Sequence, residues 1–465
     1  MKTAMIRAAG AAVVVVSSSV ALGGPLTPPV GPVSPTNKTL LQVEPRVPIE
    51  TVAGTATSMH RITQPGSYYL TGNIALAAGK DTCIEIAADG VSIDLGGFTL
   101  DGLNSTATRA VRVTEKFSCD GLRVANGHIT DWGTGIDGLS MFGAVFEGLR
   151  LTFNDDYGID AGYQAVVKGC TAVVCGNAFY LRDGGVISDC TASFSGRGFD
   201  FGGSANASAC VARDCGQGFY VNVNSTVNAC TAGNCSTGFF GAFGNSLTGC
   251  NAQSCNDGFS FAERSVLTGC RAGGAAGPGI VVGNDSVVER CTVAGAGLIG
   301  ITIGENSSVR GCDVKACGGV GIYAGFGSGA MVVDNHVTGC SLDHGIFCEG
   351  SFGRVDGNTV SGSGKFGIAV GGLGNLVVSN YVCKSSQLSG GFADYSVVTG
   401  NNSGPVVTGN GVFTATSPYA NFSCGFVLAE TARPGAAPAP AKDAAITVPK
   451  VGPAAYPGEH GGPGR

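Results

Sequence analysis

Aspartates recur at a regular spacing in the first half of the chain. Asp137, Asp160 and Asp200 each follow a Gly-Ile or Gly-Phe pair, and Asp155 and Asp156 lie shortly before Asp160. Paired carboxylates are what glycoside hydrolysis requires, since one acts as the acid and the other as base or nucleophile. If the repeat described below is stacked, Asp160 and Asp200 lie about 10 Å apart, near the range of an inverting pair. The five aspartates are therefore candidate catalytic residues.

Aromatic residues occupy the same position in neighbouring repeats. Tyr180, Tyr220 and Phe240 follow Ala-Phe or Gly-Phe pairs, and Arg182 lies two residues beyond Tyr180. A column of exposed aromatic side chains can mark a binding surface, and flat rings suit sugars, so these four residues are candidate substrate-binding residues. The alternative is an ordinary strand surface, because Tyr and Phe are favoured on strands and Asp keeps an exposed face polar.

A cysteine repeat predicts the elements that position these residues. Cysteines recur every 20 residues from Cys170 to Cys270, and then every 21 residues at Cys291 and Cys312. Each repeat carries three short apolar stretches separated by Gly, Asn, Ser and Asp, which favours strands over helices. A fixed period near 20 indicates stacked units that bury a common core. We therefore predict an all-β parallel β-helix of roughly a dozen coils, with three short strands per coil.

The same repeat fixes which side chains point outward. Gly-Phe follows most of the cysteines by eight residues, and Gly-Ile takes its place in later coils. Phe and Ile are expected to stack inward, so the residue after them points outward because side chains alternate along a strand. The aspartates and tyrosines above then form one column on the outer face of the first strand of each coil.

Beyond Cys312 the cysteine position is taken by Asn335, Asn358 and Asn380, and upstream by Asn126, with Leu149 interrupting the pattern. The segments around these asparagines, such as 332–337 and 355–360, resemble the right-handed parallel β-helix family with the pectin-lyase-like fold. That family carries an inward asparagine ladder. The segments 62–70 and 91–98 resemble the first coils of uncharacterised secreted bacterial members. The family includes lyases, hydrolases, epimerases and adhesins, so the resemblance implies a right-handed fold and leaves the function open.

The resemblance gives no complete catalytic motif. The family's hydrolases carry Gly-His-Gly and Arg-x-Lys near their acidic pairs, and neither is present here. Its lyases need a calcium-holding acidic cluster and a basic residue. Asp137, Asp155, Asp156 and Asp160 could bind calcium through their hard oxygens, but no base is evident. We expect no cofactor, with calcium as the alternative, and whether the chain is an enzyme stays open.

Nineteen cysteines in a secreted chain usually indicate disulfides. Here the ladder cysteines would share one inward column, and their parallel side chains favour a packing role as small apolar residues. A second set follows five residues later, as at Cys175, Cys215 and Cys235, near a turn that could expose some of them. Disulfides within a coil, such as Cys210–Cys215, are the alternative. The spacing lacks the close Cys pairs of zinc sites, so no metal site is predicted.

The two ends differ from the repeat. Residues 1–23 have the charged start, apolar run and small residues of a signal peptide, with an uncleaved anchor as the alternative. Residues 24–56 read as a Pro-rich linker, 57–425 as the β-helix with caps at both ends, and 426–465 as a Pro/Ala/Gly-rich disordered tail. A net charge of −6 without basic runs argues against nucleic-acid binding.

Three functions are consistent with these patterns. The first is a secreted bacterial protein, extracellular or periplasmic, that binds a polysaccharide or cell-surface polymer along its first-strand face. The second is a hydrolase or lyase acting on polyuronates through the acidic cluster. The third is a structural cell-surface spacer or adhesin. No membrane span is expected after signal cleavage.

Overall fold

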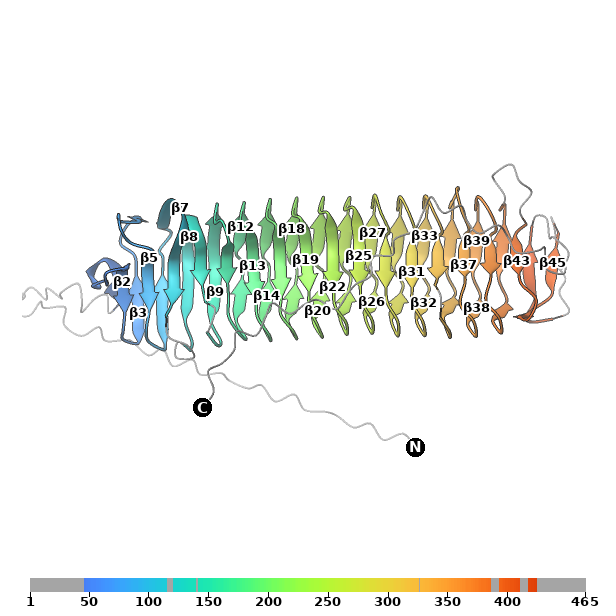
Figure 1. Ribbon diagram of the computed structural model, residues 1–465, viewed down its shortest axis with the longest axis horizontal. Coiled ribbons are helices and arrows are strands. Elements are labelled where there is room, and N and C mark those ends of the chain that lie inside the picture. The colour runs from blue at the N-terminus through green and yellow to red at the C-terminus, as the bar shows by residue number, and fades with distance from the viewer. Residues whose placement is uncertain are drawn as a thin grey trace, which may run out of the picture. The chain divides into compact units, whose positions relative to one another are not determined.

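The computed structural model describes residues 46–114, 120–138, 141–325, 327–385, 393–409 and 417–424. The predicted signal peptide, the linker up to residue 45 and the predicted tail lie outside these residues. Within them the chain is a right-handed parallel β-helix of 46 strands, with a short 3-10 helix, η1 (Ile49–Thr51), directly after the first strand. Figure 1 shows the strands stacked in chain order, from blue to orange. No helix among the described residues has the length and apolar character needed to cross a membrane.

Each coil of the regular part contains three strands that pair with the same strands one coil further. The first strands are β2 (Ser58–Ile62), β5 (Thr82–Ile86), β7 (Thr99–Val113), β8 (Arg123–Asp137), β10 (Tyr157–Asp160), β13 (Asn177–Leu181), β16 (Arg197–Phe201), β19 (Gln217–Val221), β22 (Thr237–Gly241), β25 (Asp257–Phe261), β28 (Ile280–Val282), β31 (Ile301–Ile303), β34 (Ile322–Ala324), β37 (Ile346–Cys348), β40 (Ile368–Val370) and β43 (Tyr395–Val397).

Two further columns of strands complete the coils. The second column contains β1 (Val47–Pro48), β3 (Gly66–Tyr69), β6 (Val91–Asp94), β9 (Val145–Thr152), β11 (Val166–Lys168), β14 (Val186–Ser188), β17 (Asn206–Ser208), β20 (Thr226–Asn228), β23 (Ser246–Thr248), β26 (Val266–Thr268), β29 (Val287–Glu289), β32 (Ser308–Arg310), β35 (Met331–Val333), β38 (Arg354–Asp356), β41 (Leu376–Val378) and β44 (Asn402–Ser403). The third contains β4 (Ile74–Ala75), β12 (Thr171–Val173), β15 (Thr191–Ser193), β18 (Val211–Arg213), β21 (Thr231–Gly233), β24 (Asn251–Gln253), β27 (Arg271–Gly273), β30 (Thr292–Ala294), β33 (Asp313–Lys315), β36 (His336–Thr338), β39 (Thr359–Ser361), β42 (Tyr381–Cys383), β45 (Val406–Thr408) and β46 (Asn421–Ser423). The long strands β7, β8 and β9 also extend into these columns.

The predicted fold class is confirmed, but the coil number is not. The structure has about 16 turns rather than a dozen. The extra turns include the first ones, which lack the 20-residue cysteine repeat and differ in length. There β7 and β8 run for 15 residues each instead of breaking into short strands, so no fixed period exposes them in the sequence.

Inward stacking of like residues forms the core, as predicted. The rings of Phe199, Phe219 and Phe239 stack with centroids 4.7 Å apart, and the stack continues to Phe179 and Phe259 at 5.3 and 4.8 Å. Isoleucines then take over, beginning with the pairing of Phe259 with Ile280. Each ring is buried against the ring of the next coil, so the column favours one register.

The inward ladder of cysteine and asparagine is confirmed, with one correction. All ladder cysteines are buried, and the Cys312 amide donates to Asn335 Oδ1 at 2.9 Å where the residue type changes. Asn126 does not belong to this ladder: its side chain is exposed and its φ is 61°. Gly127 takes the inward position instead, since it is paired with Leu149, and a Cβ there would lie 2.3 Å from the Leu95 side chain.

The second cysteine set is buried, which corrects the expectation that some of it is exposed. Cys175, Cys215 and Cys235 are at most 4% exposed because the turn after the third strand points them into the core. They fill space beside the Gly-Phe pairs: a Cβ on Gly218 would lie 3.3 Å from Cys235 Sγ. Cys210 and Cys215 are both free thiols, as are all 16 buried cysteines outside the one disulfide of the described residues.

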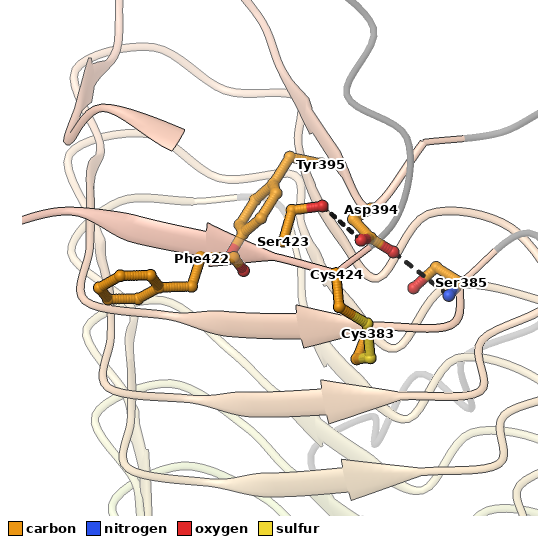
Figure 2. Close-up of a disulfide and its surroundings, with 7 residues drawn as sticks. All are labelled: Cys383, Ser385, Asp394, Tyr395, Phe422, Ser423 and Cys424. Carbon is orange, nitrogen blue, oxygen red and sulfur yellow. Dashed lines mark hydrogen bonds between the residues drawn. A yellow bond between two sulfur atoms is a disulfide. The ribbon is translucent and has the colours of Figure 1, made fainter. Parts of the chain in front are cut away.

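That disulfide joins Cys383, at the end of β42, to Cys424, just after β46 (Figure 2). The two residues are 41 positions apart and the sequence repeat did not predict their pairing. Beside the bond, Asp394 accepts hydrogen bonds from the Ser423 hydroxyl at 2.5 Å and the Ser385 amide at 3.2 Å. Together these contacts hold the last described strand against the final coil.

Candidate functional site

Six of the candidate residues, three aspartates, two tyrosines and Phe240, lie in one unbroken column on the outer face of the first strands. Asp137 is paired with Asp160, Asp160 with Tyr180, and Tyr180 with Asp200 on successive coils. Tyr220 and Phe240 continue the column. The cysteine repeat thus placed these side chains in the correct register, and their roles remain predictions.

Asp160 is covered rather than solvated. It is 5% exposed, and its carboxylate accepts a hydrogen bond of 3.3 Å from Arg182, which follows β13 on the next coil. The Arg182 guanidinium also lies over the Tyr180 ring, 5.1 Å from its centroid, and over Tyr163 at 5.7 Å. Arg182 therefore holds an acid of one coil against the aromatic rings beside it.

The same arrangement recurs two coils further. Asp200 is 6% exposed and accepts a hydrogen bond of 2.6 Å from Arg197. Arg197 lies 4.3 Å from the centroid of the Tyr220 ring and donates from Nε to Gln217 at 3.0 Å. A cation over an aromatic face is stabilised by the electrons of the ring, so each arginine contacts an acid and a tyrosine at once.

Three residues of this surface were not predicted from the sequence. Arg109 binds Asp137 at 2.6 Å, Arg197 binds Asp200, and Tyr157 lies 5.9 Å from Tyr180 between ring centroids. Strict alternation of side chains along β16 does not place Arg197 on the outer face with Asp200. Gly198 and Phe199 are both buried, so burial does not alternate along this strand. The signal that could have found it is the spacing of Arg197 to Asp200, three residues within one predicted strand.

Burial shifts the acid–base properties of these groups. Burial raises the pKa of Asp160 above its usual range, and Arg182 opposes part of that shift. Burial also raises the pKa of Asp200, against the effect of Arg197. A carboxyl with a raised pKa can keep a proton and donate it, which is the property a general acid needs. Burial raises the pKa of Tyr180 as well, so its phenol stays protonated and can donate a hydrogen bond.

Asp155 and Asp156 do not join this group. Both are exposed in the turn before β10, on the solvent side of the coil. Across the parts of the chain that the structure describes, no three His, Cys, Asp or Glu side chains lie close enough to hold a metal ion. Asp137 and Asp160 also have arginine partners. The arrangement does not fit the calcium cluster considered from the sequence.

Three solved structures are similar to this chain at low sequence identity. The periplasmic alginate epimerase AlgG is 10% identical, over 74% of this chain and 76% of that chain, with a TM-score of 0.33. The A-module of mannuronan C-5 epimerase AlgE4 from Azotobacter vinelandii is 14% identical, over 77% and 91%, with a TM-score of 0.30. A tailspike protein mutant of E. coli bacteriophage HK620 is 10% identical, over 79% and 71%, with a TM-score of 0.38.

Among curated proteins, no sequence matches this chain. Residues 257–413 match the family model described as "Right handed beta helix region". The match covers part of the described β-helix, and the parallel strand register continues the same right-handed fold before and after that region.

Proposed function

We propose that this protein binds a polysaccharide along the outer face of its first strands, between Asp137 and Phe240. The observation that carries the proposal is the column of aspartates and tyrosines, in which arginines contact acids and rings of adjacent coils. We call this stretch of the column, with Arg182 and Arg197, the Asp/Tyr face.

The chemistry of this face suits sugars. The rings of Tyr220 and Phe240 stack with centroids 5.5 Å apart, which makes a continuous apolar strip on an otherwise polar sheet. Such strips bind the C–H faces of sugar rings, while carboxylates and guanidinium groups beside them bind hydroxyl groups. The side chains are fixed by packing and ion pairs, so little conformational entropy is lost on binding.

We also propose that the protein acts outside the cytoplasm, in the extracellular or periplasmic space. Residues 1–23 have the composition of a signal peptide. The Cys383–Cys424 disulfide supports an oxidising compartment, since such bonds are rare in the reducing cytosol.

Binding is tested by affinity electrophoresis through gels that contain soluble polysaccharides. Tyr180→Ala and Tyr220→Ala should each weaken retardation about tenfold or more, the loss typical of a central aromatic contact. Phe352→Ala is the matched control, since Phe352 is 72% exposed on a turn away from this face. Unchanged binding in both tyrosine variants would refute the proposed site.

A polysaccharide hydrolase or lyase is the second candidate, and the raised pKa of Asp160 favours it. In this case Asp160 acts as the acid, with Asp200 two coils away as its partner. Release of reducing ends or unsaturated products from polyuronates and neutral glycans, with and without calcium, tests this activity. Asp160→Asn should abolish it, and a wild-type protein that cleaves none of these polymers would exclude it.

A further inference from the structure

The repeat of the Asp/Tyr face points to the class of polymer it binds. We infer that the ligand is a neutral polysaccharide with a two-sugar repeat, extended along the direction in which the coils stack. This inference rests on the proposed function and adds the charge and the period of the ligand.

The middle of the face, from Asp160 to Tyr220, repeats every two coils and not every coil. Asp160 and Asp200 alternate with Tyr180 and Tyr220 on four successive first strands. Two strand spacings correspond to about 10 Å. An extended β-1,4-linked hexose chain presents the same ring face once per disaccharide, because successive rings are flipped, and that repeat has a similar length. A chain of this kind would meet the same acid and the same ring at each repeat.

Each repeat of the face forms a unit of one acid, one arginine and one tyrosine. In the first unit, Arg182 contacts Asp160 on one coil and Tyr180 on the next. In the second, Arg197 contacts Asp200 and then Tyr220 in the same order. The two arginines approach from opposite ends of the strand, so the units share their chemistry although they are not identical in geometry.

The charges of these units are balanced within the protein. Arg182 and Arg197 are already paired with carboxylates, and Arg109 is paired with Asp137 at the start of the column. An acidic sugar would have to displace a buried carboxylate from its arginine, and the abandoned carboxylate would then be buried without a partner. The exposed Asp155 and Asp156 beside the face add negative charge. Hydroxyl groups, in contrast, can donate to the aspartates without breaking the ion pairs.

A pair of polymers with one backbone tests the charge. Hydroxyethyl cellulose and carboxymethyl cellulose differ in the charge of their substituents, and glucomannan and xylan set against alginate and polygalacturonate broaden the comparison. We expect at least tenfold tighter binding to a neutral polymer than to the acidic ones, with little change between low and high salt. Tighter binding to the acidic polymers, weakened by salt, would overturn this inference and leave the proposed function standing. Absence of binding to all six polymers would overturn both.

Oligosaccharides of the polymer that binds best test the period. Affinity measured by calorimetry should rise in steps from two to four sugars, with little gain from each odd sugar. Tyr220→Ala should remove the step between two and four sugars, about tenfold, while Phe352→Ala should retain it. A smooth rise with chain length in the wild type would overturn the two-sugar period, even if Tyr180→Ala still weakens binding.

Discussion

The Arg182 guanidinium donates a hydrogen bond of 3.3 Å to the Asp160 carboxylate across two neighbouring coils. The Asp160 side chain is 7% exposed and that of Arg182 is 21% exposed, so the pair is largely withdrawn from water. It lies on the outer face of the β-helix, where a strand surface is ordinarily solvated. The pair therefore orders side chains of the Asp/Tyr face and also holds β10 against β13.

Arg182→Gln should destabilise the protein by about 2–3 kcal/mol, because it leaves a buried carboxylate without its charged partner and removes a cation from an aromatic face. Asp160→Asn in the same chain should recover part of the loss, since the uncompensated charge is then absent. Denaturant unfolding of the two single variants and the double variant measures the coupling. Arg290→Gln, at an arginine 73% exposed beside Glu289, should change stability by under about 0.5 kcal/mol. A loss in Arg182→Gln no larger than that control would contradict a structural role for the pair.

The pH dependence of stability should change when Asp160 is replaced by Asn. Burial raises the pKa of Asp160 in the folded chain, so the folded state holds this proton more tightly than the unfolded state. The stability that this group contributes is complete below its unfolded pKa and is lost as pH rises through the folded pKa. The midpoint of wild-type thermal unfolding should therefore rise relative to Asp160→Asn between about pH 7 and about pH 4.

The control for this experiment is Asp189→Asn, at an exposed aspartate on the adjoining coil. If the difference in unfolding midpoint between wild type and this control changes with pH in the same way, the effect is not specific to Asp160. If the unfolding midpoints of wild type and Asp160→Asn differ by the same amount at every pH in the range, burial of Asp160 is not the source of a pH effect.

The sequence repeat predicted the fold and the column because both depend on regular stacking. Once the cysteines fix one register, the residue ten positions after a cysteine has a fixed side of the strand, so Tyr180 could be placed without a structure. The Gly-Ile pair before Asp160 placed that residue in the same column one coil earlier. The prediction failed where stacking is irregular. The first coils contain long strands with no cysteine. There the register places Gly127 rather than Asn126 at the inward position, and Leu95 leaves no room for a side chain at that position.

The ion pairs could not be predicted from the sequence for a different reason. An arginine side chain is long enough to reach an acid on a neighbouring coil, and the repeat says nothing about which direction it takes. Arg182 reaches back one coil to Asp160, whereas Arg197 reaches forward to the ring of Tyr220. Whether the aspartates are solvated or covered depends on these choices, so their burial and raised pKa could not be read from the pattern.

The two halves of the inward ladder should differ in their contribution to stability. The Asn358 amide accepts two hydrogen bonds from Asn335 at 3.0 Å and donates to Val332 and Asn380 at 2.8 and 2.9 Å. Asn358→Ala should cost about 3–5 kcal/mol, because it leaves buried donors and acceptors unpaired. Cys230→Ala should cost only about 1–2 kcal/mol, since it mainly leaves a small cavity. Denaturant unfolding of both variants compares their free energies of unfolding. Equal losses of stability would mean that the hydrogen bonds of the asparagines add nothing to the packing.

Reduction of the Cys383–Cys424 disulfide should open the C-terminal end of the β-helix first. The bond joins residues 41 positions apart, and the chain between them includes β43, β44 and β45 before β46 returns to pair with β42. Cross-links over loops of this size typically stabilise by about 2–4 kcal/mol through restriction of the unfolded chain.

Replacement of one cysteine tests this prediction. Cys383→Ser should lower the unfolding midpoint to the value that the wild type shows in reductant, and reductant should have no further effect on the variant. The other described cysteines are buried thiols, so alkylation without reductant should leave them unmodified in the native protein. Faster proteolysis after Cys383, with the earlier coils intact, would locate the opening at the cap. A wild-type midpoint unaffected by reductant would show that the hydrogen bonds of Asp394 and Ser423 hold this end without the disulfide.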